Sequence, residues 1–196
     1  EAQLFPTPDQ EFIDFSLVAT TLTYDRDIGV QLRGELPNKK LLYGVGIFNG
    51  TGKNLADNNK PKDLIGRVVV SPLPELSFGL AYQGGDQSPN STAEAYRTAY
   101  DVLIKYEYAK LKIQAEYIYR RQTQPSDGWY LLAAAYLSPK LQGAGRYDWL
   151  EPDRAVASDQ QTVLSTGINY FIDSNIKFMA NYLIRGEETE ISNNEF

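Results

Sequence analysis

The chain of 196 residues contains no cysteine and no histidine, and several classes of functional site require one or the other. Cysteine-ligated zinc, iron–sulfur clusters, thiol catalysis, Ser-His-Asp triads and histidine-ligated metal centres are therefore excluded. Basic residues are outnumbered, with 19 Lys and Arg against 25 Asp and Glu and a net charge of -6. Because nucleic-acid binding proteins need a basic excess to displace phosphate counterions, no nucleic-acid partner is expected. No cofactor and no metal site is predicted.

Long apolar runs are also missing, and no stretch approaches the roughly 18 residues of a membrane-spanning helix. The apolar residues instead alternate with polar ones, which is typical of β-strands. In 176–185, for example, Ile176, Phe178 and Ile184 share one face, whereas Lys177, Asn181 and Arg185 lie on the other. The alternation predicts ten strands, at 26–36, 41–50, 64–71, 76–84, 97–108, 111–121, 129–138, 142–150, 162–172 and 176–186.

The segments between these strands predict how the strands are connected. All ten prolines fall between or outside the predicted strands, as expected where both edges of a strand are hydrogen-bonded. Short connections at 37–40, 72–75, 109–110, 139–141 and 173–175 alternate with longer polar ones at 51–63, 85–96, 122–128 and 151–161. Short turns at one end and long loops at the other predict an antiparallel up-and-down meander.

Two all-β architectures fit this meander, a transmembrane β-barrel and a soluble β-sandwich. The predicted strands are longer than the five or six residues usual in globular proteins and match the 9–11 residues that cross a membrane. Tyrosine is common near the strand ends of the apolar faces, as in the aromatic girdles of outer-membrane barrels. These tyrosines are Tyr43, Tyr82, Tyr100, Tyr108, Tyr119, Tyr130, Tyr136, Tyr147, Tyr170 and Tyr182. The barrel is favoured, and the sandwich remains the alternative.

Several segments resemble, in their order and spacing, the C-terminal portion of the phosphate-selective porin O/P family of bacterial outer-membrane porins. They are 12–18 (FIDFSLV), 25–32 (DRDIGVQL) with Gly34, 43–50 (YGVGIFNG), 67–70 (RVVV) before Pro72, 128–130 (GWY), 145–149 (GRYDW) and 167–171 (GINYF). The resemblance implies a trimeric barrel porin in the outer membrane of a Gram-negative bacterium. It also implies that the ten strands belong to a 16-stranded barrel and that strands are missing at both ends.

The chain is expected to divide into two parts. Residues 1–25 fit neither strand nor turn and are predicted to be an external loop segment folded into the lumen as a constriction, with Asp9, Glu11 and Asp14 facing the pathway. Packing of this segment against a neighbouring subunit is the alternative. Residues 26–196 are predicted to form the barrel strands, as a single domain incomplete at both ends.

With the apolar faces toward lipid, the opposite faces are predicted to line water. The basic residues of this lining are Arg33, Arg67, Lys105, Lys112, Arg120, Arg146, Lys177 and Arg185, and the acidic ones are Asp27, Glu35, Asp101, Glu107, Glu116 and Asp148. A slight basic excess biases a pore toward anions. Alternatively, Arg33 with Glu35, Lys105 with Glu107 and Arg146 with Asp148 are cross-strand ion pairs that only solvate the wall. No focused ladder of Arg and Lys indicates a phosphate filter.

These observations predict a non-enzymatic outer-membrane porin for passive diffusion of small anionic or neutral hydrophilic solutes and ions. Its expected partners are outer-membrane lipid, lipopolysaccharide and two further copies of the chain in a homotrimer. A glycosidase-like carboxylate pair such as Asp101 and Glu116 is rejected, because an open aqueous wall would not tune their pKa values. The alternative function is a structural barrel with a plugged lumen, whose long loops bind an envelope or partner component.

Overall fold

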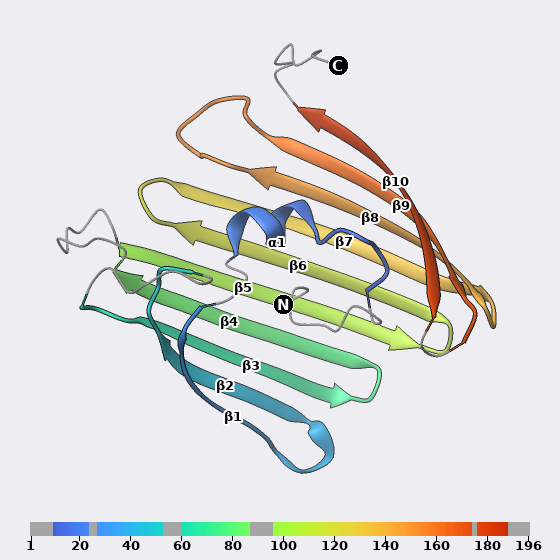
Figure 1. The fold of residues 1–196 in the computed structure, drawn as a ribbon, viewed down its shortest axis with the longest axis horizontal. Coiled ribbons are helices and arrows are strands. Elements are labelled where there is room, and N and C mark those ends of the chain that lie inside the picture. The colour runs from blue at the N-terminus through green and yellow to red at the C-terminus, as the bar shows by residue number, and fades with distance from the viewer. Residues whose placement is uncertain (1–9, 24–26, 53–59, 87–95, 174–175, 188–196) are drawn as a thin grey trace.

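The computed structural model describes residues 10–23, 27–52, 60–86, 96–173 and 176–187, and most of these lie in one antiparallel sheet (Figure 1). Ten strands pair in chain order from β1 to β10, and in the described ranges the sheet is open. The strands are β1 (Gly29–Glu35), β2 (Leu41–Phe48), β3 (Asp63–Leu73), β4 (Leu76–Asp86), β5 (Tyr96–Tyr108), β6 (Leu111–Arg121), β7 (Pro125–Ser138), β8 (Leu141–Glu151), β9 (Gln161–Phe171) and β10 (Lys177–Glu187). The predicted all-β, up-and-down topology is confirmed.

Each predicted strand is present, and the largest difference lies at β7. This strand begins at Pro125 rather than at 129, so the predicted loop at 122–128 shrinks to 122–124. Asp and Gly are common in turns, so Asp127 and Gly128 led to the prediction of a loop where the first residues of β7 lie. Both nevertheless pair in register, Gly128 opposite Ile118 and Asp127 opposite Tyr119.

The prediction that all prolines avoid the strands is wrong at two positions. Pro125 is the first residue of β7, where proline is tolerated. Pro72 lies near the end of β3, where the register with β4 shifts between Val70 and Leu73. A residue at such an irregularity is unpaired, so the missing N–H of Pro72 costs no ladder hydrogen bond.

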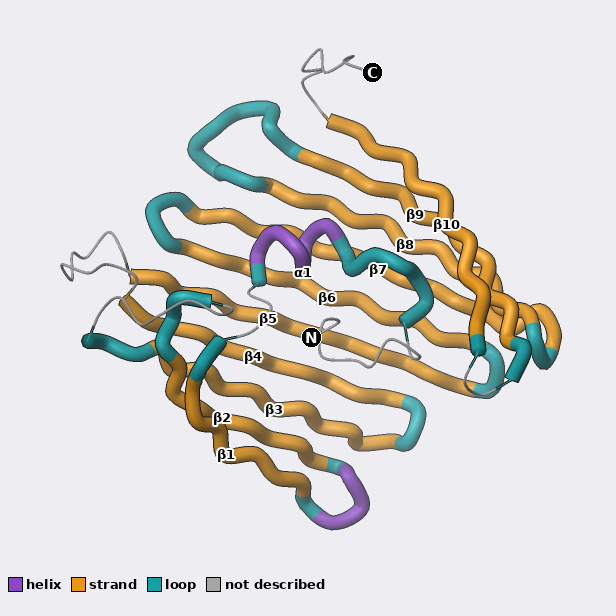
Figure 2. Tube along the Cα trace, viewed as in Figure 1, coloured by secondary structure: helices purple, strands orange, loops and turns teal. Residues whose placement is uncertain are grey.

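The connections at one end of the sheet are all short, whereas those at the other end differ in length (Figure 2). Two-residue turns join β3 to β4, β5 to β6 and β7 to β8, and Ala109 in the second of these has a positive φ of 52°. A short 3-10 helix, η3 (Pro37–Lys39), lies between β1 and β2 at the same end. The strand ends that border the longest intervals, 49–62, 87–95 and 152–160, lie at the opposite end. The three-residue connection 122–124 lies there too, so the predicted long loop between β6 and β7 is wrong. None of the helices in the described ranges is long and apolar enough to cross a membrane.

The two faces of the sheet differ in both chemistry and burial. One face, here called the apolar face, presents valine, leucine, isoleucine, phenylalanine and tyrosine side chains without a covering layer among the described residues. Val30 is 81% exposed, Phe178 64% and Tyr182 69%. Its aromatic rings contact each other across strands, with centroids 5.4 Å apart for Tyr82 and Tyr100. In a soluble sandwich such a face would be the core, so this exposure favours the barrel.

The other face, here called the polar face, carries residues 10–23, here called the inner segment, over its middle strands (Figure 1). Its helix α1 (Leu17–Leu22) crosses β6, β7 and β8. The Ser16 hydroxyl caps this helix by accepting a hydrogen bond from Ala19 N, at 2.9 Å. Sequence analysis predicted a loop here, because a single helical turn and a half is too short to set a period.

Two small apolar clusters hold the inner segment on the polar face. In the first, Val18, Ala19 and Leu22 pack against Ile118 and Leu150. In the second, Phe12 packs against Tyr130, Leu132 and Ala134 of β7. Strand β7 is therefore apolar on both faces, which explains why its sequence carries no clear alternation.

Candidate functional site

The strand register brings the predicted lining residues onto one face. Residues that pair across neighbouring strands point to the same face of the sheet. Arg33 lies opposite Gly44, which lies opposite Arg67, so Arg33 and Arg67 share a face. The same tracing places all thirteen strand-borne candidates, eight basic and five acidic, on the polar face. Asp27 precedes β1, where its carboxylate accepts hydrogen bonds from Ile28 N and Gly50 N. Whether this face lines water remains a prediction.

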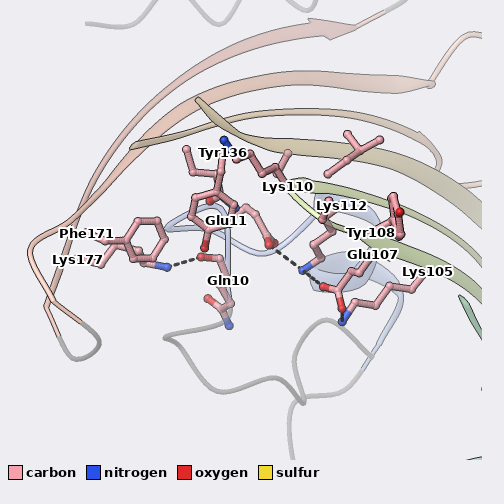
Figure 3. Close-up of a pocket in the computed structure, with 14 residues that line it drawn as sticks. Gln10, Glu11, Lys105, Glu107, Tyr108, Lys110, Lys112, Tyr136, Phe171 and Lys177 are labelled. Atoms are coloured by element: carbon pink, nitrogen blue, oxygen red, sulfur yellow. Dashed lines mark hydrogen bonds and ion pairs between the residues drawn. The ribbon is translucent and has the colours of Figure 1, made fainter. Parts of the chain in front are cut away.

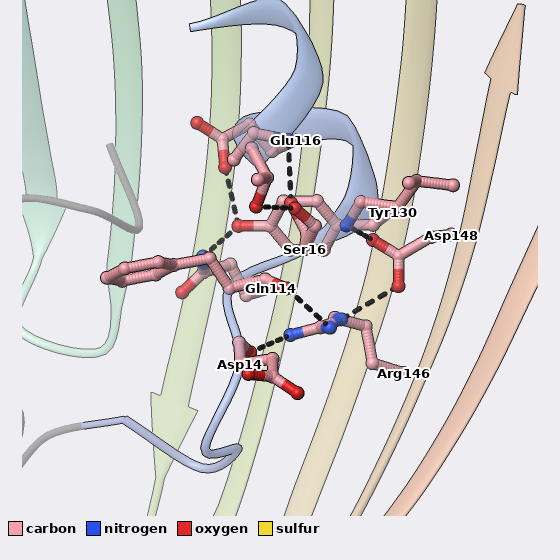
Figure 4. A network of polar contacts seen from close by, with 11 residues as sticks. Asp14, Ser16, Gln114, Glu116, Tyr130, Arg146 and Asp148 are labelled. Atoms are coloured by element: carbon pink, nitrogen blue, oxygen red, sulfur yellow. Dashed lines mark hydrogen bonds and ion pairs between the residues drawn. The ribbon is translucent and has the colours of Figure 1, made fainter. Parts of the chain in front are cut away.

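The centre of the site is a buried ion pair on β8 (Figure 4). Arg146 Nε donates to Asp148 Oδ2 at 2.8 Å, and the two side chains are 6% and 0% exposed. The other nitrogens of Arg146 donate to the main-chain oxygens of Asp14 and Phe15, at 3.1 and 3.0 Å. Asp148 Oδ1 accepts from Leu17 N at 3.0 Å. The pair therefore binds the backbone of the inner segment on both sides of Ser16.

A second buried network lies beside the first and joins β6 to β7 (Figure 4). Tyr130 OH donates to Glu116 Oε2 at 2.5 Å and accepts from Gln114 Nε2 at 2.5 Å. Tyr130 is 2% exposed and Glu116 also 2%. The interpretation of Tyr130 as a lipid-facing girdle residue is therefore wrong, and so is that of Tyr136, which pairs with Gln142 on the polar face. The alternation could not set their phase because β7 is apolar on both faces.

Three more predicted basic residues contact the inner segment. Lys112 Nζ lies 2.7 Å from Glu11 Oε1. Lys177 Nζ donates to Gln10 O at 2.5 Å, and Arg120 donates to Thr21 O at 3.0 Å. With Arg146, half of the eight basic candidates thus bind this segment. The positive charges of these four residues therefore help to hold the inner segment in position.

The predicted constriction residues have different environments. The side chain of Glu11 is 11% exposed because it pairs with Lys112. Asp14 has an exposed side chain, and its main-chain oxygen binds Arg146. Asp9 lies outside the described residues. The inner segment lies against the sheet, and the position of Glu11 and Asp14 on a solute pathway stays a prediction.

The proposed solvating ion pairs form in two of three cases. Lys105 Nζ lies 3.0 Å from Glu107 Oε2, and Arg146 pairs with Asp148. Both pairs form within a single strand, between residues two apart, so the prediction that they are cross-strand pairs is wrong. The Arg146–Asp148 pair is also buried and binds the inner segment, so it does more than solvate the wall. Among the described residues, Arg33 and Glu35 make no ion pair, and both are exposed.

Sequence reasoning missed two further ionic groups at the long-loop end. Arg97 Nη2 lies 2.5 Å from Asp63 Oδ2, and both side chains are buried, at 1% and 0% exposed. Arg154 Nε lies 2.5 Å from Asp127 Oδ1, a contact that raises the pKa of Arg154. The predicted strand 97–108 includes Arg97 on the same face as Asp101. The acidic partners were missed because Asp63 and Asp127 lie just before the predicted strands 64–71 and 129–138.

A channel-like division into an apolar outer face and a polar, partly filled inner face agrees with the comparison to known families. A family model described as putative beta-barrel porin-2, OmpL-like, matches residues 15–193. The chain belongs to this family. No curated protein and no solved structure matched the chain in the other two comparisons.

Membership of the porin-2 family supports the coarser part of the sequence-based assignment. A porin-type barrel is shown, and the family implies a non-enzymatic outer-membrane channel. The match is not to the phosphate-selective porin O/P family, so the resemblance holds at the level of the porin-type barrel and gives no solute.

Proposed function

We propose that this porin-2 protein forms a water-filled channel through which small hydrophilic solutes and ions diffuse passively. The division of the sheet into two faces carries the proposal. Thirteen ionisable strand residues share the face that bears the inner segment, whereas most of the large exposed apolar side chains of the strands share the other. Such a sheet is unstable in water and suits a wall between lipid and an aqueous lumen.

We further propose a weak preference for anions, phosphate-like anions included. Eight basic candidates against the five acidic ones that lie on the strands give the polar face an excess of three positive charges. Glu11 and Asp14 reduce this excess to one, because the described residues of the inner segment include no Lys or Arg. A weak preference rather than a selective filter is therefore expected.

Ion current through the intact, detergent-extracted protein in a planar bilayer tests both proposals. Stepwise conductance is expected, and under a salt gradient the sign of the zero-current potential gives the preference. The double variant Arg33→Glu with Arg185→Glu removes two exposed cations of the polar face and should shift that potential toward cations. The matched control is Lys140→Glu, which changes charge only in the turn between β7 and β8. An unshifted potential in the double variant would show that these residues do not face the pathway.

A second candidate function, a structural barrel with a plugged lumen whose loops bind a partner, has one observation in its favour. The inner segment is anchored by two apolar clusters and by the Arg146–Asp148 pair. Such anchoring is expected of a plug that stays fixed in the lumen. Folded, heat-modifiable protein that produces no conductance steps would favour this candidate over the channel.

We also propose that the apolar face contacts outer-membrane lipid and lipopolysaccharide, and a neighbouring subunit in a homotrimer. The aromatic contacts support this role, since Tyr and Trp are enriched at lipid–water interfaces. Tyr100, which contacts Tyr82, also contacts Tyr119, and the ring centroids of Tyr100 and Tyr119 are 6.3 Å apart. The ring centroids of Trp129 and Tyr147 are 5.6 Å apart. Native mass spectrometry in detergent should give the mass of three chains.

A further inference from the structure

A cavity of about 480 Å³ lies on the polar face near the turn between β5 and β6, beside the start of the inner segment (Figure 3). Its volume falls within the range of roughly 300–1,000 Å³ usual for ligand sites. Four lysines and two glutamates line it: Lys105, Lys110, Lys112, Lys177, Glu11 and Glu107. The lining thus has a basic excess of two, although the whole chain has a net charge of -6.

The acidic residues of the cavity are fixed by ion pairs. Glu11 pairs with Lys112 at 2.7 Å, and Glu107 lies 3.0 Å from Lys105 and 4.0 Å from Lys112. Lys110 makes no side-chain hydrogen bond or ion pair with another described residue. Because the carboxylates are already engaged, an anion entering the cavity meets a positive field.

Aromatic rings form another part of the lining, close to Lys177 (Figure 3). Tyr136 and Phe171 have ring centroids 5.6 Å apart and are tilted by 35°. Lys177 Nζ lies 5.7 Å from the centroid of Phe171. The polar side chain of Gln142 also lines the cavity. Ligand sites that combine ring surfaces with a few charged and amide groups bind solutes with both an apolar ring face and polar substituents.

We propose that this cavity binds an acidic saccharide of one or two rings, whose carboxylate lies among the lysines and whose ring lies against Tyr136 and Phe171. The lysines of the cavity would attract the carboxylate of the ligand, and the aromatic rings would contact the face of its sugar ring. Gln142 Oε1 already accepts from Asn169 Nδ2 at 2.8 Å, which leaves the Nε2 group of Gln142 as the donor for a hydroxyl group. This inference rests on the proposed channel, in which such a solute would meet the site during diffusion.

Isothermal titration calorimetry on the intact detergent-solubilised protein tests the site without requiring conduction. The probes are glucuronate, glucose, sulfate and benzoate. Glucuronate is expected to bind about tenfold or more tighter than each of the other three, because only it offers both the charge and a hydroxylated ring. Tighter or equal binding of glucose would overturn the anionic part, and equal binding of sulfate or benzoate would overturn the saccharide part.

Three variants locate the binding. Lys110→Gln removes one charge without breaking a described side-chain contact and should weaken glucuronate roughly threefold to tenfold. Phe171→Leu keeps an apolar side chain but removes the ring and should weaken it about fivefold. Lys140→Gln makes the same charge change in the turn between β7 and β8, outside the cavity, and should leave affinity unchanged. Wild-type affinity in both Lys110→Gln and Phe171→Leu would overturn the site.

Bilayer recordings separate this proposal from that of the channel. If the protein conducts but glucuronate does not bind, the inference fails and the channel stands. If glucuronate binds as expected and the protein does not conduct, the site stands and the plugged barrel replaces the channel.

Discussion

The substitution Arg146→Gln should detach the inner segment from the sheet. The guanidinium of Arg146 makes three described hydrogen bonds, to Asp148 and to the main-chain oxygens of Asp14 and Phe15. Glutamine cannot reproduce this fork, and it leaves the fully buried carboxylate of Asp148 without its cation. Breaking one partner of a buried ion pair costs about 3–5 kcal/mol. The docked state of the segment should be destabilised by that amount.

Hydrogen exchange read by mass spectrometry measures this loss directly. Thr20 N and Thr23 N donate to Ser16 O and Ala19 O in the docked helix, so their protection reports docking. A loss of 3–5 kcal/mol corresponds to exchange roughly 150-fold to 4,000-fold faster. In the same variant the conductance should rise, because the segment leaves the polar face for part of the time.

Two controls separate docking from general instability. Arg185→Gln removes an exposed arginine of the same face and should leave exchange in α1 unchanged. The double variant Arg146→Met with Asp148→Leu removes both charges and should recover part of the protection, because no buried carboxylate is left unpaired. Wild-type exchange at Thr20 in Arg146→Gln would refute the role of the ion pair in holding the segment.

Two further substitutions test the contacts around the inner segment. Gly128→Val should displace α1, because even a Cβ at this position would lie 2.7 Å from Trp149 O and 3.0 Å from Val18; exchange in α1 should rise, whereas Gly145→Ala, with no atom within 4 Å of the added Cβ, should leave it unchanged. Tyr130→Phe removes the donor to Glu116 and should cost about 1–3 kcal/mol in urea unfolding of the detergent-solubilised protein. An unchanged midpoint would mean that the Glu116 network contributes nothing to stability.

The strands were predictable from sequence because the two faces of most strands differ in polarity. In β6, Ile113, Ala115 and Tyr117 face one side and Lys112 and Glu116 the other, so the period of two is visible without any tertiary information. The same period fixed the phase of every strand-borne lining candidate. It failed at β7, where Phe12 and α1 cover a second apolar face and make Tyr130 indistinguishable from a lipid-facing residue.

The environment of the site could not be predicted, because its contacts join residues far apart in the chain. Leu17 N binds Asp148 across 131 positions, and Asn169 binds Glu11 O across 158. Neither partner carries a local signal of the other. The sequence identified Arg146 and Asp148 as charged residues of one face, whereas only the fold shows that they hold backbone rather than line open water.

The anchors of the inner segment also define its direction in the proposed lumen. Glu11 binds Lys112 near the short-turn end of β6, and Thr21 O binds Arg120 near the long-loop end. The two anchors on β6 are separated by eight residues, roughly 26 Å at 3.3 Å per residue. Because the strands of such barrels tilt by about 35–45°, this distance corresponds to about 20 Å along the membrane normal, roughly two thirds of the 30 Å thickness of the bilayer core. The segment therefore runs along the wall rather than across it, so in the proposed channel it would narrow the lumen over most of its length. Its release should accordingly increase conductance as a whole rather than remove a single point of block.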